Sequence, residues 1–147
     1  MVHYAARRFF ANVYAGCNID KDYANVAFSL ANDGAQPWQG SVVLTVSRFD
    51  SARALWAKEF PLAVAARDNS RFFAQSVAAT LAAAGCSDAR ACFLWGAINH
   101  ATTDANTAAT NEPGQISDAY TFFARAAAIQ TPLASVTLLV KSVSNPL

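Results

Sequence analysis

Tyr23-Ala24-Asn25-Val26-Ala27-Phe28-Ser29-Leu30 is the stretch that decides the fold of this 147-residue chain. Apolar residues alternate with polar or small ones through it, and the alternation stops at the turn signal Asn32-Asp33-Gly34. Successive side chains of a β-strand point to opposite faces of a sheet, so the pattern predicts a strand with one buried face. Val42, Leu44 and Val46 form the apolar face of a second predicted strand, with Ser41, Thr45 and Ser47 on the opposite face.

Further short segments lie between turn signals at roughly ten-residue spacing. They predict strands over residues 9–15, 54–62, 71–75, 92–98 and 120–125, with residues 36–40 as a loop and a break at residues 68–70. Residues 92–98 are too apolar for a half-exposed strand and should lie centrally in their sheet. The regular spacing predicts an all-β sandwich.

One segment follows a helical period instead. Val77 and Leu81 are spaced i, i+4 in an alanine-rich run, with Ser76 placed as the N-cap and Gly85 placed as the C-terminal stop. This pattern predicts a short crossover helix over residues 76–85. Residues 101–115 lack any period and predict a long loop.

The expected core combines the inward positions of these strands with large aromatic side chains. Hydrophobic residues make up 54% of the chain, but alanine supplies much of that share, so the ten phenylalanines and three tryptophans must fill the interior. The predicted core is Val26, Phe28, Leu30, Val42, Leu44, Val46, Leu94, Trp95, Ile98, Tyr120 and Phe122.

Composition argues against several classes of partner and cofactor. The net charge is +1 with no basic block, which gives no reason to expect nucleic-acid binding. The longest apolar runs fall well short of the roughly 20 residues that span a bilayer. With two histidines and three cysteines at unsuitable spacing, we expect no metal site and no cofactor.

The sequence predicts no catalytic residue. Glu59 and Glu112 are the glutamates of the chain, and both have the setting of solvated surface residues, in a strand beside Lys58 and in the loop. A nucleophilic pair of Cys17 with His3 or His100 has no supporting pattern, and Cys17 is interpreted as a small apolar filler at a strand end.

Two tryptophans are considered as a platform for a sugar ring. Trp38 lies beside Pro37 in a predicted turn, and Trp56 lies in a strand near charged residues. Packing against a sheet or a neighbouring domain is the commoner fate of such residues, so both interpretations stay open.

Cys86 and Cys92 enclose a short polar loop between the predicted helix and the strand that follows. A disulfide closing this loop is sterically easy, and two reduced thiols in a cytosolic protein are an equally good interpretation of the residues alone.

Three segments carry a resemblance to family 2 β-mannosidases. His3-Tyr4-Ala5-Ala6-Arg7-Arg8-Phe9-Phe10-Ala11 resembles the junction between the catalytic barrel's last helix and the next immunoglobulin-like domain. Residues 81–94 are similar to a helix, glycine, Cys-loop-Cys and strand segment of lysosomal-type members. Ser117-Asp118-Ala119-Tyr120-Thr121-Phe122-Phe123 resembles the domain's final strand.

The resemblance implies a domain order. Residues 1–8 would be a helix stub from the preceding barrel, and residues 9–130 an immunoglobulin-like antiparallel β-sandwich with one short crossover helix. Residues 131–147 would be a linker or the first strand of a following domain. The partners implied are the barrel and the C-terminal domain of the same parent chain.

The resemblance also implies a function for the parent, which would hydrolyse terminal β-linked mannose with retention, in a lysosomal or secretory compartment. Its catalytic glutamates belong to the barrel, so none is carried over here. The resemblance favours the disulfide between Cys86 and Cys92. Alternatives are the linker domain of an exo-β-glucosaminidase-like family 2 enzyme, or a self-standing carbohydrate-binding module.

Overall fold

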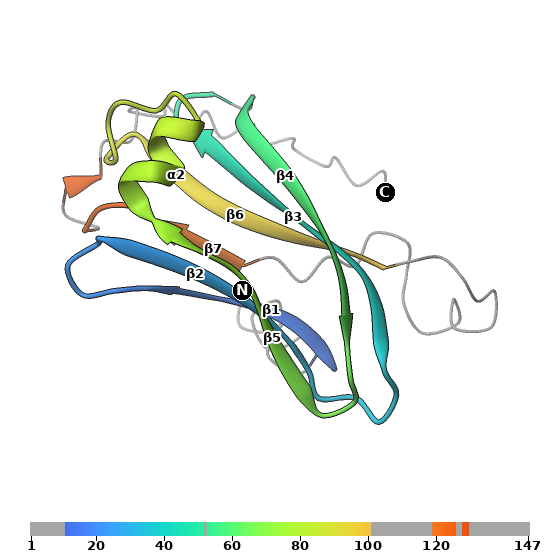
Figure 1. Cartoon of the computed structure of the whole chain (residues 1–147). Helices are drawn as coiled ribbons and strands as arrows, with labels where there is room; N and C mark the ends of the chain where they lie inside the picture. Colours follow the sequence, from blue (N-terminus) through green and yellow to red (C-terminus); the bar gives the residue numbers. More distant parts are fainter. Residues whose placement is uncertain (1–10, 52, 101–118, 126–127, 130–147) are drawn as a thin grey trace, which may run out of the picture.

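Two β-sheets and one short helix make up the structure, a computed structural model that describes residues 11–51, 53–100, 119–125 and 128–129 (Figure 1). The helix is α2 (Val77–Ala83). The strands are β1 (Val13–Ile19), β2 (Asn25–Asn32), β3 (Trp38–Arg48), β4 (Ala54–Val64), β5 (Asp68–Ser76), β6 (Cys92–His100) and β7 (Ala119–Phe122).

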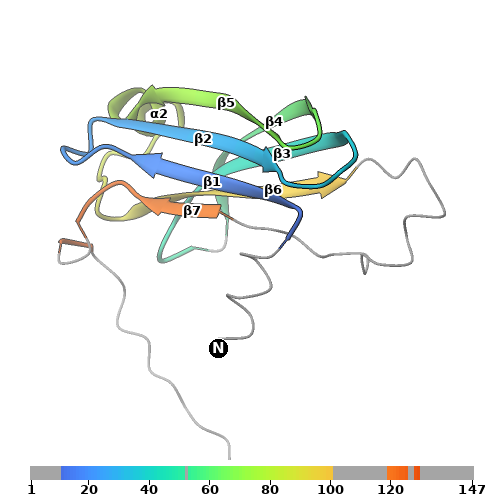
Figure 2. The same ribbon diagram turned by 90° about the horizontal axis from the view of Figure 1, so that it is seen from below.

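The sheets face each other as two layers (Figure 2). One has the strand order β1-β2-β5 and the other the order β4-β3-β6-β7, and every neighbouring pair is antiparallel. The chain changes sheet between β2 and β3 and again between β4 and β5, and α2 carries it back from β5 to β6. This arrangement confirms the immunoglobulin-like antiparallel sandwich with one short crossover helix.

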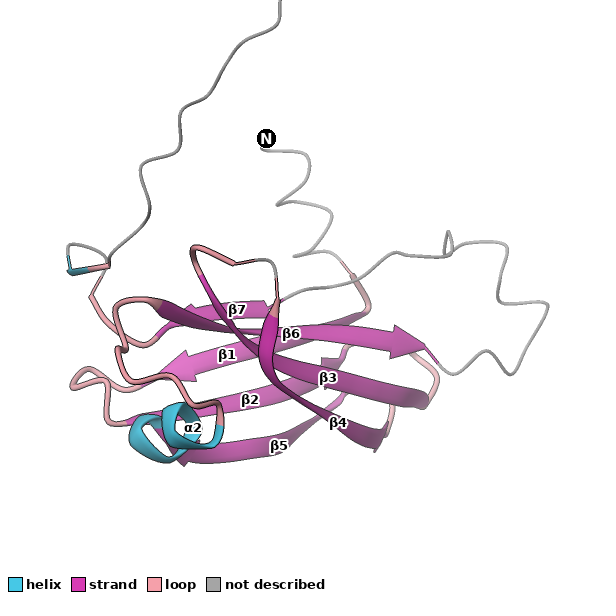
Figure 3. Ribbon diagram, turned by 90° about the horizontal axis from the view of Figure 1, so that it is seen from above, coloured by secondary structure: helices cyan, strands magenta, loops and turns pink. Residues whose placement is uncertain are grey.

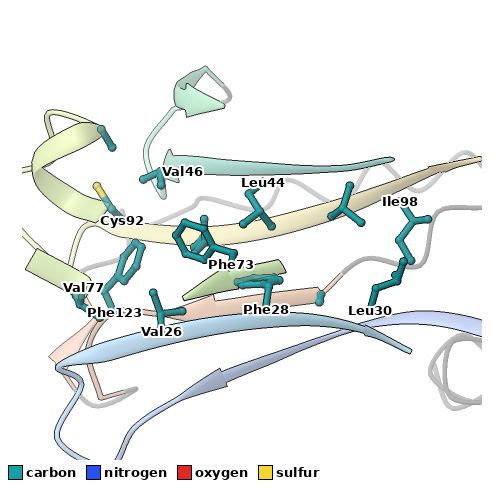
Figure 4. Close-up of a cluster of buried hydrophobic side chains, with 14 of the residues drawn as sticks. Val26, Phe28, Leu30, Leu44, Val46, Phe73, Val77, Cys92, Ile98 and Phe123 are labelled. Atoms are coloured by element: carbon teal, nitrogen blue, oxygen red, sulfur yellow. The ribbon is translucent and has the colours of Figure 1, made fainter. Parts of the chain in front are cut away.

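The core lies between the two inner faces (Figure 4). On β2 every second side chain is buried. The predicted apolar side chains of β3 and β6 pack against them from the opposite sheet. None of these side chains exposes more than 3% of its surface, which confirms the predicted core positions Val26, Phe28, Leu30, Val42, Leu44, Val46, Leu94 and Ile98.

The predicted core positions Trp95 and Phe122 are wrong. Leu94 points inward, so the period of two turns Trp95 to the outer face of the four-stranded sheet. Phe122 pairs in register with Phe93, which also faces outward, and both aromatic side chains are only half-buried. Tyr120 pairs with Trp95 in the same register. The side chain of Tyr120 lies outside the described part of the chain.

Several boundaries also differ from the expectation. Residues 38–40 belong to β3 rather than to a loop, and β5 already begins at Asp68 because the chain reverses at Arg67, whose φ is 58°. Among the described residues the first strand begins at Val13, and residues 9 and 10 of the predicted strand lie outside the described part of the chain. Asn32 was expected in a turn but ends β2 as a buried residue.

Other expectations fall on residues that the structure does not describe. These are the helix stub over residues 1–8, the loop over residues 101–115 and the segment 131–147. Within the described ranges, no helix is long and apolar enough to cross a bilayer.

Candidate functional site

The end of the sandwich next to α2 carries the predicted cysteine pair. Ser76 caps α2, its hydroxyl oxygen accepting a hydrogen bond from the Ala79 amide at 3.2 Å. After the helix, Gly85 takes a φ of 64°, and the Cys86 amide donates to the Leu81 carbonyl oxygen at 2.9 Å. This is the glycine-terminated helix end that the sequence predicts.

A disulfide joins Cys86 to Cys92, and their Cα atoms are 6.8 Å apart. Cys92 is the first residue of β6 and is fully buried, and Cys86 is buried beside it. The bond therefore fastens the segment after α2 to the start of β6, an interior strand of the four-stranded sheet. The Ala91 amide closes the loop between the cysteines by donating to the Asp88 carbonyl oxygen at 3.0 Å.

One ion pair lies within this loop, and a second joins the last residue of β3 to the turn that follows it. Arg48 donates to both carboxylate oxygens of Asp50 at 2.9 and 2.7 Å, and Arg90 donates to both oxygens of Asp88 at 3.0 Å each. In each pair the hydrogen bond from the arginine lowers the pKa of the aspartate. Both pairs lie at the surface, where such contacts contribute little to stability.

Aromatic side chains gather on the outer face of the four-stranded sheet at this same end. The Phe49 ring, in the turn after β3, stacks on Phe93 at 5.0 Å between centroids and lies 5.9 Å from the Phe122 ring. We call the group of Phe49, Phe93, Trp95 and Phe122 the outer patch, and all four side chains are half-buried or in contact with half-buried rings.

The outer patch is connected to the disulfide loop through the backbone. The Phe49 amide donates to the Ala91 carbonyl oxygen at 3.0 Å. The Trp95 indole Nε1–H donates to the Ser47 hydroxyl at 3.4 Å, which places the indole over β3. This patch was not predicted from the sequence. It could have been found there, because Phe93 and Phe122 are large aromatic residues at outward positions of their strands.

Of the two interpretations that the sequence leaves open for Trp38, the exposed sugar platform is wrong and the packed position is the one the structure shows. Trp38 is 8% exposed and belongs to the core. Its ring lies so close to the backbone that a Cβ on Gly40 would come within 2.6 Å of it, which explains the glycine at that position. Trp56 is half-buried, opposite Val46 on the inner face of β4, and packs against the core.

The candidate catalytic groups do not form a site in the described part of the chain. Glu59 is exposed on β4 and accepts a hydrogen bond of 2.5 Å from the Ser41 hydroxyl. Glu112 and His3 lie outside the described residues, as does the side chain of His100. Among the residues that are described, no three histidines, cysteines or acidic groups lie close enough together to hold a metal ion.

Cys17 is the free cysteine of the described region. It lies within β1 opposite Phe28 and packs against the core, so it is not at a strand end as expected. Burial raises the pKa of its thiol to about 11, and a hydrogen bond with the Thr121 side chain lowers that pKa in part. A thiol that stays protonated at neutral pH is a poor nucleophile.

No protein-family model matches this chain, and a search of curated proteins found no match. A function for this chain therefore rests on its own sequence and structure, in particular on the sandwich and the disulfide.

Proposed function

We propose that this chain is a non-catalytic, immunoglobulin-like structural domain of a larger glycoside hydrolase that resembles family 2 β-mannosidases. The observation that carries the proposal is the layout of residues 81–94. In order, this segment holds the helix end, Gly85 in the left-handed conformation, the disulfide loop and the start of the interior strand β6. The resemblance implies the same order of parts.

The geometry of the chain supports a spacer role. β1 begins at Val13, beside Asn32, and β7 ends at Phe122, beside Phe93. These points are at opposite ends of the sandwich, as Figure 2 shows. A catalytic barrel before β1 and a C-terminal domain after β7 would therefore attach at opposite ends, with the sandwich holding them apart.

The parent enzyme, under this proposal, hydrolyses terminal β-linked mannose with retention, and its catalytic glutamates lie in the barrel. Retaining glycosidases need two carboxyl groups about 5–5.5 Å apart. Glu59 is the glutamate that the structure describes, and it is hydrogen-bonded to Ser41 on an exposed strand. The disulfide is compatible with a lysosomal or secretory compartment, because such bonds persist in oxidising environments.

Two alternatives stay open. The linker domain of an exo-β-glucosaminidase-like family 2 enzyme would have the same architecture, so only the parent's substrate separates it from the main proposal. A self-standing carbohydrate-binding module needs an exposed aromatic platform, and the burial of Trp38 and the inward packing of Trp56 weaken that alternative.

Isolation of the native polypeptide tests the proposal. An antibody raised against this chain should capture, from the source cells, a polypeptide several times heavier than 15.6 kDa that cleaves a chromogenic β-mannoside. A captured polypeptide of this chain's own mass without such activity contradicts the proposal. Cleavage of a β-glucosaminide instead favours the first alternative, and binding of the isolated chain to mannan favours the second.

A further inference from the structure

The turn between β2 and β3 contains the dipeptide Asp33-Gly34, the one place in the chain where glycine follows an aspartate. This turn lies at the end of the sandwich opposite α2, where the chain passes from one sheet to the other (Figures 1 and 3). The Asp33 side chain is exposed. Because glycine has no side chain, nothing shields the Gly34 nitrogen from the neighbouring carboxyl group. The pair is therefore suited to a backbone rearrangement of aspartate.

This rearrangement has two steps and needs only water. First, the Gly34 nitrogen attacks the Asp33 Cγ atom. The new N–C bond closes a five-membered succinimide ring, and the amide proton leaves with a carboxyl hydroxyl group as water. Water then adds to one of the two ring carbonyl carbons and breaks its bond to nitrogen. Opening at Cγ restores aspartate, whereas opening at the backbone carbonyl carbon gives isoaspartate, in which the backbone runs through Cγ and is longer by a CH2 group.

In the folded protein the attacking nitrogen is held by a hydrogen bond. The Gly34 amide donates to the Asn32 Oδ1 atom at 3.0 Å, and Asn32 is 1% exposed. The Asn32 side-chain nitrogen donates in turn to the carbonyl oxygens of Gln36 and Ala65, at 2.9 and 3.1 Å, which fixes the acceptor in place. The nitrogen becomes a nucleophile only when its proton is removed. A proton in a hydrogen bond to a buried group is removed only after that bond opens.

The turn is also held at Asp33 itself. The Asp33 amide donates to the Asn12 carbonyl oxygen at 2.7 Å, directly before β1. Closing the succinimide ring requires the backbone between Asp33 and Gly34 to rotate, and hydrogen bonds on both residues resist that rotation. The structure therefore combines a reactive dipeptide with contacts that prevent its reaction.

We propose that Asp33-Gly34 is a latent isoaspartate site and that the Asn32 side chain protects it in the folded protein. Isoaspartate then forms only in molecules whose turn has opened, so it records local opening at this end of the sandwich. The longer backbone of the product no longer matches the hydrogen bonds of Asn32, which keeps a converted turn open. This inference does not rest on the proposed glycosidase parent, because it uses only the chemistry and contacts of the turn.

Prolonged incubation of the full chain at neutral pH tests the inference. An endoprotease that cleaves before aspartate does not cleave before isoaspartate, so peptides left uncut at Asp33 measure the conversion. Conversion should be at least about ten times slower in the folded protein than in a synthetic peptide of residues 29–39, because local opening limits it. Equal rates overturn the protection, and a peptide that does not convert at Asp33 overturns the site.

Variants of the full chain identify the protecting group. Asn32→Ala should bring conversion close to the peptide rate, whereas Asn18→Ala, at an exposed position of β1, should leave it unchanged. An unchanged rate in a folded Asn32→Ala variant contradicts the role of Asn32.

Asp33→Asn tests the same attack without altering Asn32. Ammonia then leaves in place of water, so ring closure and opening are read directly as a gain in mass. This variant should lose ammonia at least about ten times more slowly in the protein than in the matching peptide. Equal rates overturn the proposal, whether or not Asn32→Ala folds.

Discussion

The side-chain amide nitrogen of Asn32 lies 3.1 Å from the carbonyl oxygen of Ala65, and this hydrogen bond joins the end of β2 to the turn after β4. The same nitrogen donates to the Gln36 carbonyl oxygen at 2.9 Å, and the Asn32 Oδ1 atom accepts from the Gly34 amide at 3.0 Å. Asn32 is 1% exposed. One buried side chain therefore satisfies backbone groups of both turns at this end of the sandwich.

Asn32→Ala should lower the free energy of unfolding by about 1–3 kcal/mol, because it removes a part-buried set of hydrogen bonds to backbone groups of both turns and the buried one to the Val64 carbonyl oxygen. Urea unfolding followed by circular dichroism measures the change. Asn18→Ala, at an exposed position of β1, is the matched control and should change stability by less than about 0.5 kcal/mol. Equal effects of the two variants would show that the Asn32 network does not stabilise the fold.

Gly96 lies beneath Phe28 in the core. A Cβ at Gly96 would come within 2.9 Å of the Leu44 side chain and 3.2 Å of the Phe28 ring. Gly96→Ala should therefore destabilise the protein by about 1–3 kcal/mol through overpacking. Gly16→Ala is the control, because a Cβ there would meet nothing within 4 Å, and it should be close to neutral.

Phe28→Ala should cost about 3–5 kcal/mol, since the ring is fully buried. Combined with Gly96→Ala, the loss should be smaller than the sum of the two single losses, because removing the ring makes room for the added methyl group. A strictly additive double variant in urea unfolding would mean that Gly96 and Phe28 do not compete for the same space.

The sequence was sufficient to predict strands that bury one face. On β2 and β3 the inward positions hold large apolar residues and most outward positions hold polar or small ones, so the period of two identifies Phe28 and Leu44 as core residues. The helix was equally predictable, because Ser76 and Gly85 mark its two ends.

Strands with apolar residues on both faces were not predictable in this way. Leu94 and Trp95 are both hydrophobic, so the pattern of β6 does not say which of them points inward. Trp38 lies between Pro37 and Gly40, which reads as a loop, and only the long pairing of β3 with β4 places it in a strand. Such residues are assigned by tertiary contacts that no local pattern contains.

Cys17 should react slowly with iodoacetamide in the folded protein. Its thiol pKa of about 11, raised from 9.0 mainly by burial, makes the reactive thiolate roughly a hundred times rarer than in the unfolded chain at pH 8. The alkylation rate should rise about tenfold per pH unit between pH 8 and 10. Mass spectrometry of timed samples measures it, and a rate equal to that in denaturant would contradict the burial.

The raised pKa of Cys17 also predicts a pH dependence of stability. Between pH 9 and 11 the unfolded chain loses this proton while the folded protein keeps it, so stability falls as the pH rises through that range. Cys17→Ala should remove this part of the decline.

Thr121→Val removes the hydrogen bond that lowers the pKa of the Cys17 thiol, so it should slow alkylation further. Faster alkylation in that variant would show that Thr121 does not stabilise the thiolate.

The isolated chain should hydrolyse a chromogenic β-mannoside no faster than buffer. The reaction needs an acid and a nucleophile facing each other across the glycosidic bond, and Glu59 instead lies on the exposed strand β4, hydrogen-bonded to Ser41. Turnover that follows the protein through purification and disappears in Glu59→Gln would contradict this. Glu59→Gln should otherwise leave both the buffer-level rate and the fold unchanged.

The disulfide between Cys86 and Cys92 should contribute about 2 kcal/mol to stability, the amount expected when a short loop is closed in the unfolded chain. The double variant Cys86→Ala, Cys92→Ala removes it without placing a polar group in the core, and urea unfolding measures the loss. Cys17→Ala is the matched control, because it removes a thiol that takes no part in the bond.

The pairing itself is tested by mass spectrometry of an unreduced digest, which should find the peptides of Cys86 and Cys92 joined. A digest in which Cys17 is joined to either of them, or in which all three thiols are alkylated without reductant, would refute the pairing.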